Sequence, residues 1–411
     1  MTAIEPRSSE PNTGQTPSWE GQLSDSNRAL GTREVLPDLV RAAALMGIAV
    51  VNSTVFAYPM EQGVYGEPSV GTVNYGAAYG MFWLAAGKFY ALFSLMFGAS
   101  LFYQIGAADR SDADFTRRQT RRLVGLGIIG LVHYILFFLG DILVTYALLG
   151  ALLLTQIKSS DKALIRLGIG LILLQVLVLL GFSGLFAAME AFKPGLVASK
   201  MGPSMDGAME AFSSERFIDP AVFRISSYAD LLPGVLLSQG IATFGYFCLG
   251  LAFARKGWIS DPSAAIWARS RSVFLPLGLI LGGIGAWLVT QAQSGFDGMA
   301  MLGLAVLFLA APGQSLGYAG LLAALAKNPG PIVSFISKAG SASLTAYLLQ
   351  SVIMATVFSG WGLGFYGQLP AAQVIGVGVA TGLATILATA LWMSVFKRGP
   401  VETVFRAWTY G

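Results

Sequence analysis

Ten long apolar runs constrain the fold of this chain more than any other feature. They cover roughly residues 39–58, 86–106, 122–139, 141–157, 164–188, 231–254, 273–292, 299–325, 339–358 and 373–395. About 20 apolar residues in a helix cross the roughly 30 Å hydrocarbon core of a bilayer. Lipid cannot satisfy an open backbone, so each run is predicted to be helical. We therefore expect an all-α, polytopic integral membrane helical bundle with about ten transmembrane helices.

The scarcity of charge separates this chain from soluble proteins. Only 12% of its residues are charged and 55% are hydrophobic, whereas a soluble domain carries about a quarter charged residues. The single cysteine, Cys248, lies in an apolar run, so no intrachain disulfide can form. One histidine and one cysteine cannot build a zinc site, and we expect no metal. We also expect no nucleic acid partner, because the basic residues follow a membrane pattern.

The domain organisation is predicted to be simple. Residues 1–34 are rich in polar residues and lack an apolar core, so they are interpreted as a disordered cytoplasmic tail rather than a signal peptide. Residues 35–411 are expected to form a single transmembrane helical domain. The longest connection, at about 189–230, is the only sizeable segment expected outside the membrane. A stretch at about 72–85 is interpreted as an amphipathic helix that leads into the second run.

Lysine and arginine gather in alternate connections, which predicts the orientation. Cytoplasmic loops of membrane proteins carry an excess of these residues. With the N-terminus inside, most of the 26 lysines and arginines fall in inside segments, including Arg117–Arg122, "RRQTRR". Lys193, Lys200, Arg216 and Arg224 fall outside. Both termini are therefore predicted to be cytoplasmic.

Glycine patterns in the runs are interpreted as helix packing. "GLGIIG", Gly125–Gly130, matches a dinucleotide-binding pattern, but that pattern needs a strand before it. Here it lies inside a predicted transmembrane helix, where small residues let helices approach closely. The same interpretation applies to Gly278 with Gly282 and to Gly378 with Gly382.

The only histidine of the chain, His133, lies in "HYILFFLGDIL" with Asp141 eight residues later. His133 is ten residues into the third run, about 15 Å deep at 1.5 Å per residue, and Asp141 is expected about 12 Å further out. On a straight helix the two cannot touch. Asp141 would reach another helix, or His133 only through a kink or a water at Gly140. His133 is a candidate general base or proton relay, or a neutral imidazole bonded between helices.

The first run opens with a second pair of candidates, Asp38 and Arg41. Three residues apart, they share a helix face and could form an ion pair at the inner surface. Arg41 could equally hold a phosphate, or extend to the membrane surface from the helix end. Asn52 follows eleven residues later, at mid-membrane to outer depth.

Three further polar residues complete the candidates. Lys88, in "GKFYALFSLMFG", is expected at the outer boundary of the second run, where it extends to the surface or, less favourably, lines a cavity. Tyr347 and Gln350, in "SLTAYLLQS", share one side of the ninth run. They are expected to join helices by hydrogen bonds.

Several blocks resemble the bacterial YeiB-like family, domain of unknown function 418. They are "DLVRAAALMGIAVVN", "LFSLMFGASL", "GLVHYILFFLGDILVTYALLGALLL", "SLTAYLLQSVI", "GWGLGFYGQLP" and "FKRGPVETVFRAWTYG". The resemblance implies a multi-pass protein of about ten spans in the bacterial cytoplasmic (inner) membrane. It places eight residues on characteristic positions: Asp38, Arg41, Asn52, His133, Asp141, Tyr146, Tyr347 and Gln350.

The first run is also similar to the pattern of two groups of membrane acyltransferases, the heparan glucosaminide acetyltransferase type and the O-acyltransferases of bacterial polysaccharides. The latter pattern ends in a histidine eleven residues after the arginine, a position that Asn52 occupies here. If this fold transfers acyl groups, His133 is the only histidine able to act as base. The chain departs from the pattern of the YeiB-like family that it resembles at Ala42, usually glycine, and in "GSASLTAY", where Ser341 replaces an arginine and Ala346 an asparagine.

Two functions from different classes remain open. The first is an integral membrane acyltransferase that moves an acyl group from a cytoplasmic thioester such as acyl-CoA to a hydroxyl or amine. Acyl-CoA would be a co-substrate, with no bound cofactor. The acceptor would be a small molecule, glycan or lipid, and the partners would be the lipid bilayer and a second copy in a homodimer. Its catalytic residues would be His133 and Asp141, and its substrate-binding residues Asp38, Arg41, Asn52, Lys88, Tyr146, Tyr347 and Gln350.

The second function is a membrane transporter of a small solute with His133 as a proton relay. Transporters often contain broken helices at the bilayer midplane. In "APGQSLGYAG", Pro312 and Gly313 could break the eighth run. A structural membrane protein without small-molecule chemistry is a third interpretation.

Overall fold

The structure is a computed structural model that describes the chain except for residues 1–33, 61, 110–113, 198–204 and 293. Residues Val35–Gly411 form one compact unit, and Met1–Glu34 are assigned to another. The predicted tail at 1–34 therefore lies, apart from Glu34, outside the described residues.

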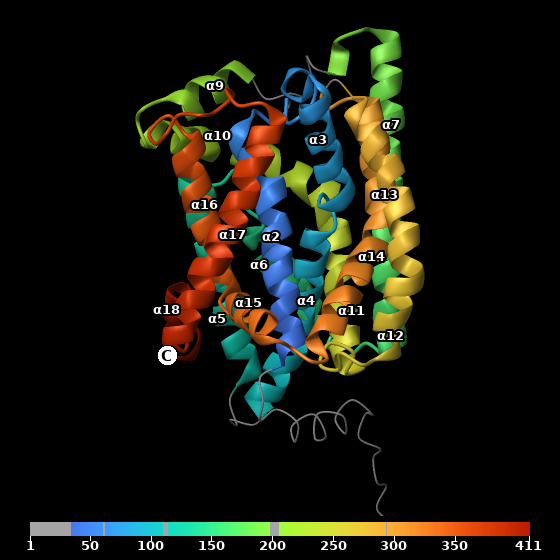
Figure 1. Ribbon diagram of the computed structural model, residues 1–411, viewed down its shortest axis with the longest axis vertical. Helices are drawn as coiled ribbons and strands as arrows, with labels where there is room; N and C mark the ends of the chain where they lie inside the picture. Colours follow the sequence, from blue (N-terminus) through green and yellow to red (C-terminus); the bar gives the residue numbers. More distant parts are fainter. Residues whose placement is uncertain (1–33, 61, 110–113, 198–204, 293) are drawn as a thin grey trace, which may run out of the picture. The chain divides into compact units, whose positions relative to one another are not determined.

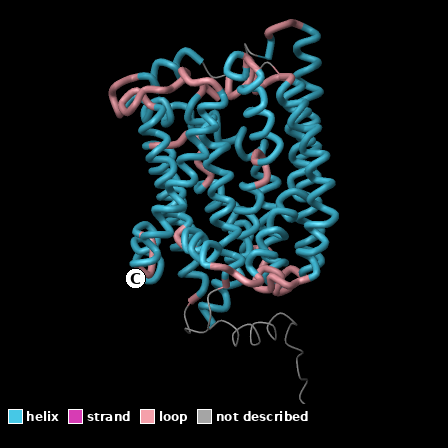
Figure 2. Tube along the Cα trace, viewed as in Figure 1, coloured by secondary structure: helices cyan, strands magenta, loops and turns pink. Residues whose placement is uncertain are grey.

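The described chain is built from α-helices, and no β-strand occurs among its residues. The α-helices are α2 (Val35–Ala57), α3 (Thr72–Leu84), α4 (Phe89–Asp109), α5 (Phe115–Leu136), α6 (Leu143–Leu154), α7 (Asp161–Phe192), α9 (Met205–Ser213), α10 (Ile218–Val235), α11 (Ile241–Arg255), α12 (Ala265–Arg269), α13 (Leu275–Thr290), α14 (Gly298–Ala326), α15 (Pro331–Gly340), α16 (Ser343–Phe358), α17 (Ala371–Val395) and α18 (Pro400–Tyr410). The long helices of the compact unit stand side by side as a bundle (Figures 1 and 2). Short π-helical turns join α10 to α11 and α12 to α13.

Seven helical stretches of the described chain are long and apolar enough to cross a membrane. An eighth arises if α15 and α16, which are bent by 79° at the break between them, count as one span. Every predicted run contains a helix. However, α5 is not among the seven stretches, and α6 has only 12 residues, about 18 Å of helix. The predicted helical membrane bundle is confirmed, whereas the count of ten spans stays a prediction.

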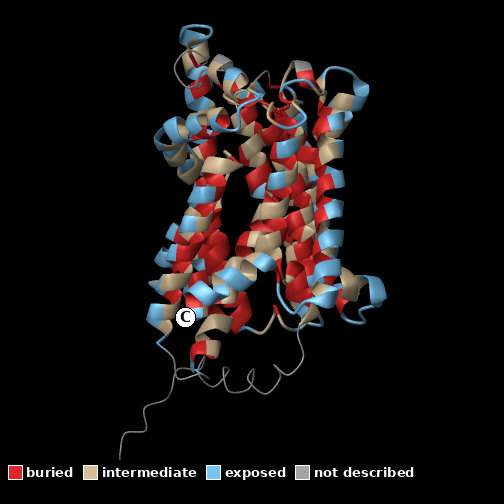
Figure 3. Ribbon diagram, turned by 90° about the vertical axis from the view of Figure 1, so that its left-hand side faces the viewer, coloured by how far each residue is buried: buried red, intermediate tan, exposed pale blue. Residues whose placement is uncertain are grey.

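The outward-facing surface of the bundle is apolar. Buried residues face the interior and exposed residues face outward (Figure 3). Large hydrophobic side chains such as Leu177 and Ile280, each 63% exposed, lie on that outer surface. A soluble monomer rarely exposes so much apolar area, so this surface suits contact with lipid.

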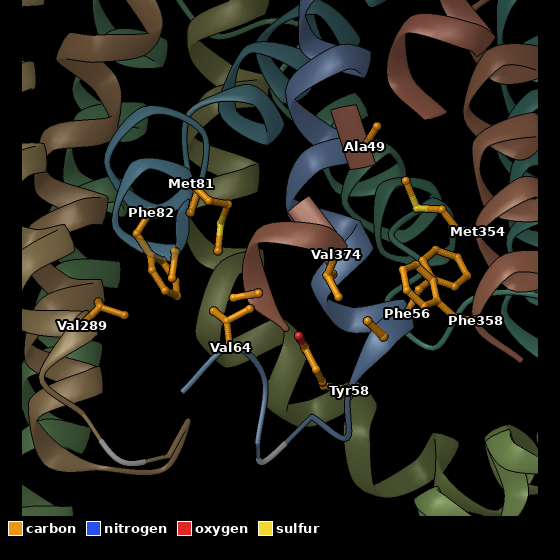
Figure 4. Close-up of a cluster of buried hydrophobic side chains, with 14 of the residues drawn as sticks. Ala49, Phe56, Tyr58, Val64, Met81, Phe82, Val289, Met354, Phe358 and Val374 are labelled. Carbon is orange, nitrogen blue, oxygen red and sulfur yellow. The ribbon is translucent and has the colours of Figure 1, made fainter. Parts of the chain in front are cut away.

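A cluster of buried hydrophobic side chains fills the bundle near the C-terminal ends of α2 and α16 (Figure 4). Phe56 of α2 stacks on Phe138, with ring centroids 4.3 Å apart. Tyr58 donates its hydroxyl to the carbonyl of Leu369 at 2.6 Å. Phe138 belongs to the turn after α5, so this turn is anchored on the packed core.

The helical stretch Thr72–Asp109 is interrupted between α3 and α4, where Gly87 adopts a left-handed φ of 84°. The predicted amphipathic helix at 72–85 is α3, which packs against α13 and α17 within the bundle. An interrupted helix leaves carbonyls without helical partners. Side chains of α14 donate to two of them, Gln314 Nε2 to Trp83 O at 3.0 Å and Tyr318 Oη to Leu84 O at 3.0 Å. Ser315 Oγ of α14 also donates to Lys88 O at 2.9 Å, a carbonyl that already accepts the N–H of Leu92.

The prediction that Pro312 and Gly313 could break the eighth run is wrong. Helix α14 continues through both residues from Gly298 to Ala326. Neighbouring helices tolerate a proline in a buried transmembrane helix when they satisfy the freed backbone groups. The segment "APGQSLGYAG" instead presents the side chains that close the break between α3 and α4.

The glycine pairs act as predicted, at close helix crossings. A Cβ atom on Gly278 would lie 2.6 Å from the backbone nitrogen of Gln314, and one on Gly282 would lie 2.4 Å from its Oε1. Cβ atoms on Gly378 and Gly382 would collide with side chains of α2. Small residues therefore set the distances between these helices.

The C-terminal helix α18 lies at the end of the bundle that holds the start of α2 (Figure 1). Its Glu402 carboxylate accepts hydrogen bonds from the backbone N–H groups of Leu344 at 2.8 Å and Thr345 at 3.0 Å, in the first turn of α16. Its Trp408 donates to the carbonyl of Arg121 in α5 at 2.8 Å. Helix α18 therefore caps the first turn of α16 and is hydrogen-bonded to α5.

Candidate functional site

His133 and Asp141 are in direct contact. The Nδ1 atom of His133 lies 2.8 Å from Oδ1 of Asp141, and both side chains are almost fully buried. Helix α5 ends at Leu136, and the chain turns back before α6 begins at Leu143. The expectation that Asp141 lies further along the helix axis is therefore wrong. The alternative of a bend near Gly140 gives the observed contact.

Asp141 also binds the start of α6. Its Oδ2 atom accepts the backbone N–H groups of Leu143 at 2.9 Å and Val144 at 3.2 Å. A helix N-terminus carries unpaired N–H groups and a partial positive charge, both of which stabilise a carboxylate. One side chain thus caps α6 with one oxygen and orients the histidine with the other.

This arrangement determines which ring nitrogen of His133 is basic. An ionised carboxylate only accepts hydrogen bonds, so Nδ1 carries a proton and donates it to Asp141. The lone pair of the neutral ring is then on Nε2. Among the described residues Nε2 has no hydrogen-bond partner, although it is buried. Hydroxyl and amide oxygens elsewhere in the described chain also lack a partner, but Nε2 is the one such atom that can serve as a general base for a bound ligand.

Gly130 lets α5 and α6 come close enough for the pair to form. A Cβ atom there would lie 2.7 Å from the backbone nitrogen of Val144 and 3.0 Å from Oδ2 of Asp141. Gly130 is the last glycine of "GLGIIG", so the packing interpretation of that motif applies directly beside the site.

Arg224, on α10, fixes the other side of the turn. Its guanidinium donates to the last carbonyls of α5 and its cap: Ile135 and Leu136 at 3.1 Å, and Phe137 at 2.9 Å. The side chain is 2% exposed, and a cation at a helix C-terminus is favourable. The sequence analysis assigned Arg224 to the outside segment and missed this role. Local sequence could not reveal it, because its partners lie 87 to 89 residues earlier.

Two predicted tyrosines join the same centre. The ring of Tyr347, on α16, lies 5.1 Å from that of His133, and its buried hydroxyl has no hydrogen-bond partner among the described residues. Tyr146, on α6, shares a 2.6 Å hydrogen bond with Ser94 of α4. The site therefore draws buried polar groups from four helices, and Ser94 is a member that sequence reasoning missed.

Gln350 and Asn52 lie apart from these contacts. Gln350 donates to the carbonyl of Leu45 at 3.1 Å and to Thr385 at 3.3 Å, so it joins α16 to α2 and α17 as expected. Asn52 is half-buried on α2, and the structure records no contact between it and His133.

The expectation that Lys88 extends to the membrane surface is wrong. Its side chain is fully buried, and Nζ donates to the carbonyl of Phe82 at 2.8 Å. The reason is the break between α3 and α4, whose free carbonyl attracts the ammonium into the protein. Lys88 therefore belongs to this break and not to the surface.

Asp38 and Arg41 form the expected ion pair near the start of α2, with Oδ1 and Nη1 3.1 Å apart. The Arg41 side chain remains 24% exposed and can accept another ligand. Ser341, where the resemblance to the YeiB-like family implies an arginine, bonds only locally in the structure, from Oγ to the carbonyl of Lys338 at 2.6 Å. It does not replace a guanidinium.

A narrow cavity borders Asp141 between α5, α6 and α10. Its volume is about 20 Å³, and its lining includes Tyr134, Asp141 and Tyr228. A water molecule needs roughly 10–15 Å³ by this measure, so the cavity has room for water but not for a thioester. His133 is not one of its lining residues. No group of three metal-binding side chains occurs among the described residues.

Comparisons with known proteins show what the sequence is similar to. Residues 253–411 match the family described as "Protein of unknown function (DUF418)". The chain is 28% identical over 393 residues to protein YeiB of Escherichia coli strain K12, covering 92% of this chain and 96% of that protein. It is 27% identical over 389 residues to YxaH of Bacillus subtilis strain 168, covering 91% and 93%. A 39.9 kDa Bacillus acidopullulyticus protein from the amylase 3′ region is 23% identical over 384 residues. No solved structure matches the chain.

Proposed function

The chain belongs to the YeiB-like DUF418 family, and we propose that it is an integral membrane acyltransferase with His133 as its general base. The family assignment rests on the match of residues 253–411 and on relatives that align with nearly the whole chain. Neither describes a reaction, so the proposal depends on the geometry of the site.

The observation that carries the proposal is the oriented histidine. Asp141 holds the Nδ1 side of the ring, and Nε2 is buried and without a partner among the described residues. A carboxylate that orients a histidine and stabilises its protonated form is the recurring partner of a histidine base in acyl transfer. A purely structural histidine would be expected to bond through both nitrogens.

The proposed reaction follows from this orientation. Nε2 removes the proton of an acceptor hydroxyl or amine while the acceptor atom attacks the thioester carbonyl carbon. The carbon–sulfur bond then breaks, the acyl group stays on the acceptor, and the leaving thiolate takes the proton from the imidazolium. Asp141 stabilises that imidazolium. A positioned base of this kind accelerates a reaction by roughly 10²–10⁴-fold.

The membrane arrangement in this proposal has ten spans in a bacterial inner membrane, with both termini in the cytoplasm. The thioester, such as acyl-CoA, enters from the cytoplasmic side, where Arg41 lies. Ser159 and Ser213 test the orientation in a Cys248→Ala background. Ser159→Cys should react with an impermeant thiol reagent only in opened cells, and Ser213→Cys in intact cells. The reverse pattern would contradict the orientation.

The test of the enzyme is acyl-thioester consumption by the purified protein in detergent, followed by release of free thiol. His133→Gln should abolish turnover with unchanged thermal stability, because glutamine keeps the size but cannot carry a proton. Asp141→Asn should reduce turnover less, since it keeps the shape. Tyr134→Phe, one residue along α5, is the matched control and should stay active. Full activity of His133→Gln would exclude the base.

A proton-coupled transporter is the second candidate, and the break between α3 and α4 favours it. Interrupted helices inside a bundle are typical of transporter binding sites, and this one contains the buried ammonium of Lys88. Solute uptake by liposomes containing the protein distinguishes the two. Uptake that depends on His133, without thioester consumption, would favour transport.

A further inference from the structure

Arginine side chains stack on aromatic rings where the C-terminal helix α18 packs against α5. The guanidinium of Arg121, on α5, lies over the ring of Trp408, on α18, 5.6 Å from the ring centroid. Arg118 of α5 and Arg406 of α18 both lie over the ring of Tyr410, at 5.0 Å and 4.3 Å from its centroid. Residues three apart are neighbours on a helix, so the two rings hold three guanidinium groups beside one another. These five residues form an arginine–aromatic surface.

The two helices that build this surface carry much more positive than negative charge. Helix α5 contains four arginines and no acidic residue, and α18 contains Arg406 and one acidic residue, Glu402. Both carboxylate oxygens of Glu402 already accept hydrogen bonds from the start of α16. Neither Arg121 nor Arg406 takes part in an ion pair among the described residues. The like charges held on the two rings therefore repel one another, and a bound anion would stabilise them.

The stacked geometry leaves the arginines able to bind an anion. A guanidinium that stacks by its face on an aromatic ring can still bind through its N–H edge. Arg406 is exposed and Arg121 is half-buried, so a ligand can reach both. The rings also fix the guanidinium groups before a ligand arrives, which lowers the entropy that binding costs. Guanidinium groups fixed in this way suit the oxygens of a phosphate.

The arginine–aromatic surface lies at the edge of the apolar outer surface of the bundle. On α5, Arg121 shares one helix face with Val124 and Ile128, which are exposed. On α18, exposed Val404 and Trp408 lie four residues apart, and this helix stands at the end of the bundle (Figure 1). Tryptophan and tyrosine are enriched where a membrane meets water, and basic residues there attract anionic lipid. This position favours the phosphate of a membrane lipid over a dissolved phosphate.

We propose that the arginine–aromatic surface binds the phosphate headgroups of anionic phospholipids, with Arg118, Arg121 and Arg406 as the contacts. A headgroup bound there joins α18 to α5, because its phosphate contacts guanidinium groups of both helices. Helix α18 also caps the first turn of α16, so the lipid stabilises that turn through α18. The surface is separate from the candidate catalytic histidine and does not depend on the proposed reaction.

Thermal unfolding of the purified full-length protein in an uncharged detergent tests the surface. Phosphatidylglycerol added to the micelles should raise the melting temperature and should stay bound when the protein is washed with lipid-free detergent. Equal amounts of phosphatidylcholine or of inorganic phosphate should have a clearly smaller effect. Arg121→Gln and Arg406→Gln should each raise the phosphatidylglycerol concentration that gives the half-maximal effect by about fivefold.

Arg117→Gln is the matched control, because it removes the same charge from an exposed position of α5. It should change the half-maximal lipid concentration by less than about twofold. Equal changes in Arg117→Gln and Arg121→Gln would overturn the surface in favour of diffuse attraction. Equal stabilisation by phosphatidylcholine or by inorganic phosphate would contradict an anionic lipid as the ligand. Arg406 is exposed, so Arg406→Gln should fold, and an unchanged lipid response in this variant would also overturn the proposal.

Discussion

Two interruptions of the helical bundle, the turn between α5 and α6 and the break between α3 and α4, pair their free backbone groups with different side chains. Both free backbone groups in an apolar interior, where an unpaired group is costly. At the first turn Arg224 binds the carbonyls and Asp141 the N–H groups. At the second break the side chains of α14 and Lys88 bind the carbonyls.

The difference lies in what remains unpaired. After the backbone of the α5–α6 turn is satisfied, Nε2 of His133 still has no partner in the described chain. At the α3–α4 break, the ammonium of Lys88 donates to the carbonyl of Phe82, and the atom without a partner in the described chain is the amide oxygen Oε1 of Gln314, which cannot act as a general base. The comparison indicates that the turn between α5 and α6 is the candidate functional site. The break between α3 and α4, called the α3–α4 joint below, has a structural role. Interrupted helices alone therefore do not identify a functional centre.

The largest effect on stability is expected at Arg224. Arg224→Gln leaves carbonyls at the end of α5 unpaired and should lower the free energy of unfolding by about 3–5 kcal/mol. Thermal unfolding in detergent measures this loss. Arg216→Gln, at a side chain that is 76% exposed, should change stability by less than about 0.5 kcal/mol. Similar stability of the two variants would show that the turn between α5 and α6 does not depend on the hydrogen bonds of Arg224.

A smaller effect is expected at the α3–α4 joint. Gln314→Leu leaves the carbonyl of Trp83 unpaired and should lower the free energy of unfolding by about 1–3 kcal/mol. Specific activity per folded molecule should stay normal, because the joint does not touch His133. A stable Gln314→Leu with reduced activity would reverse the comparison and make the joint part of the site.

The smallest effect is expected for Lys88→Met. This change removes one hydrogen bond, but it also removes a buried charge, and such exchanges are often close to neutral. The melting temperature and thioester turnover should therefore be nearly unchanged. If Lys88→Met abolishes solute uptake while the protein remains folded, the α3–α4 break is a functional centre and transport becomes the better proposal.

The sequence predicted the parts of the fold that depend on local chemistry. Apolar length located a helix in every expected run, and paired glycines marked helix crossings. The contact between His133 and Asp141 was not predicted as such, because a straight helix keeps residues eight apart from meeting. The reversal after Leu136 depends on Arg224, which comes from a distant helix. The burial of Lys88 depends likewise on the break between α3 and α4, which is closed by Gln314, Ser315 and Tyr318. The sequence segment that contains these three residues was interpreted as interrupting its own helix.

The contact between Glu402 and the first turn of α16 has a consequence for biosynthesis. A chain is synthesised from its N-terminus, and its parts can fold as they emerge. Helix α16 carries Tyr347, which packs on His133, yet the first N–H groups of α16 are capped by Glu402, which follows Leu344 by 58 residues. The cap can therefore form only after synthesis has passed Glu402, and a protein truncated before this residue would contain every residue of the candidate site but lack the contact that fixes the start of α16.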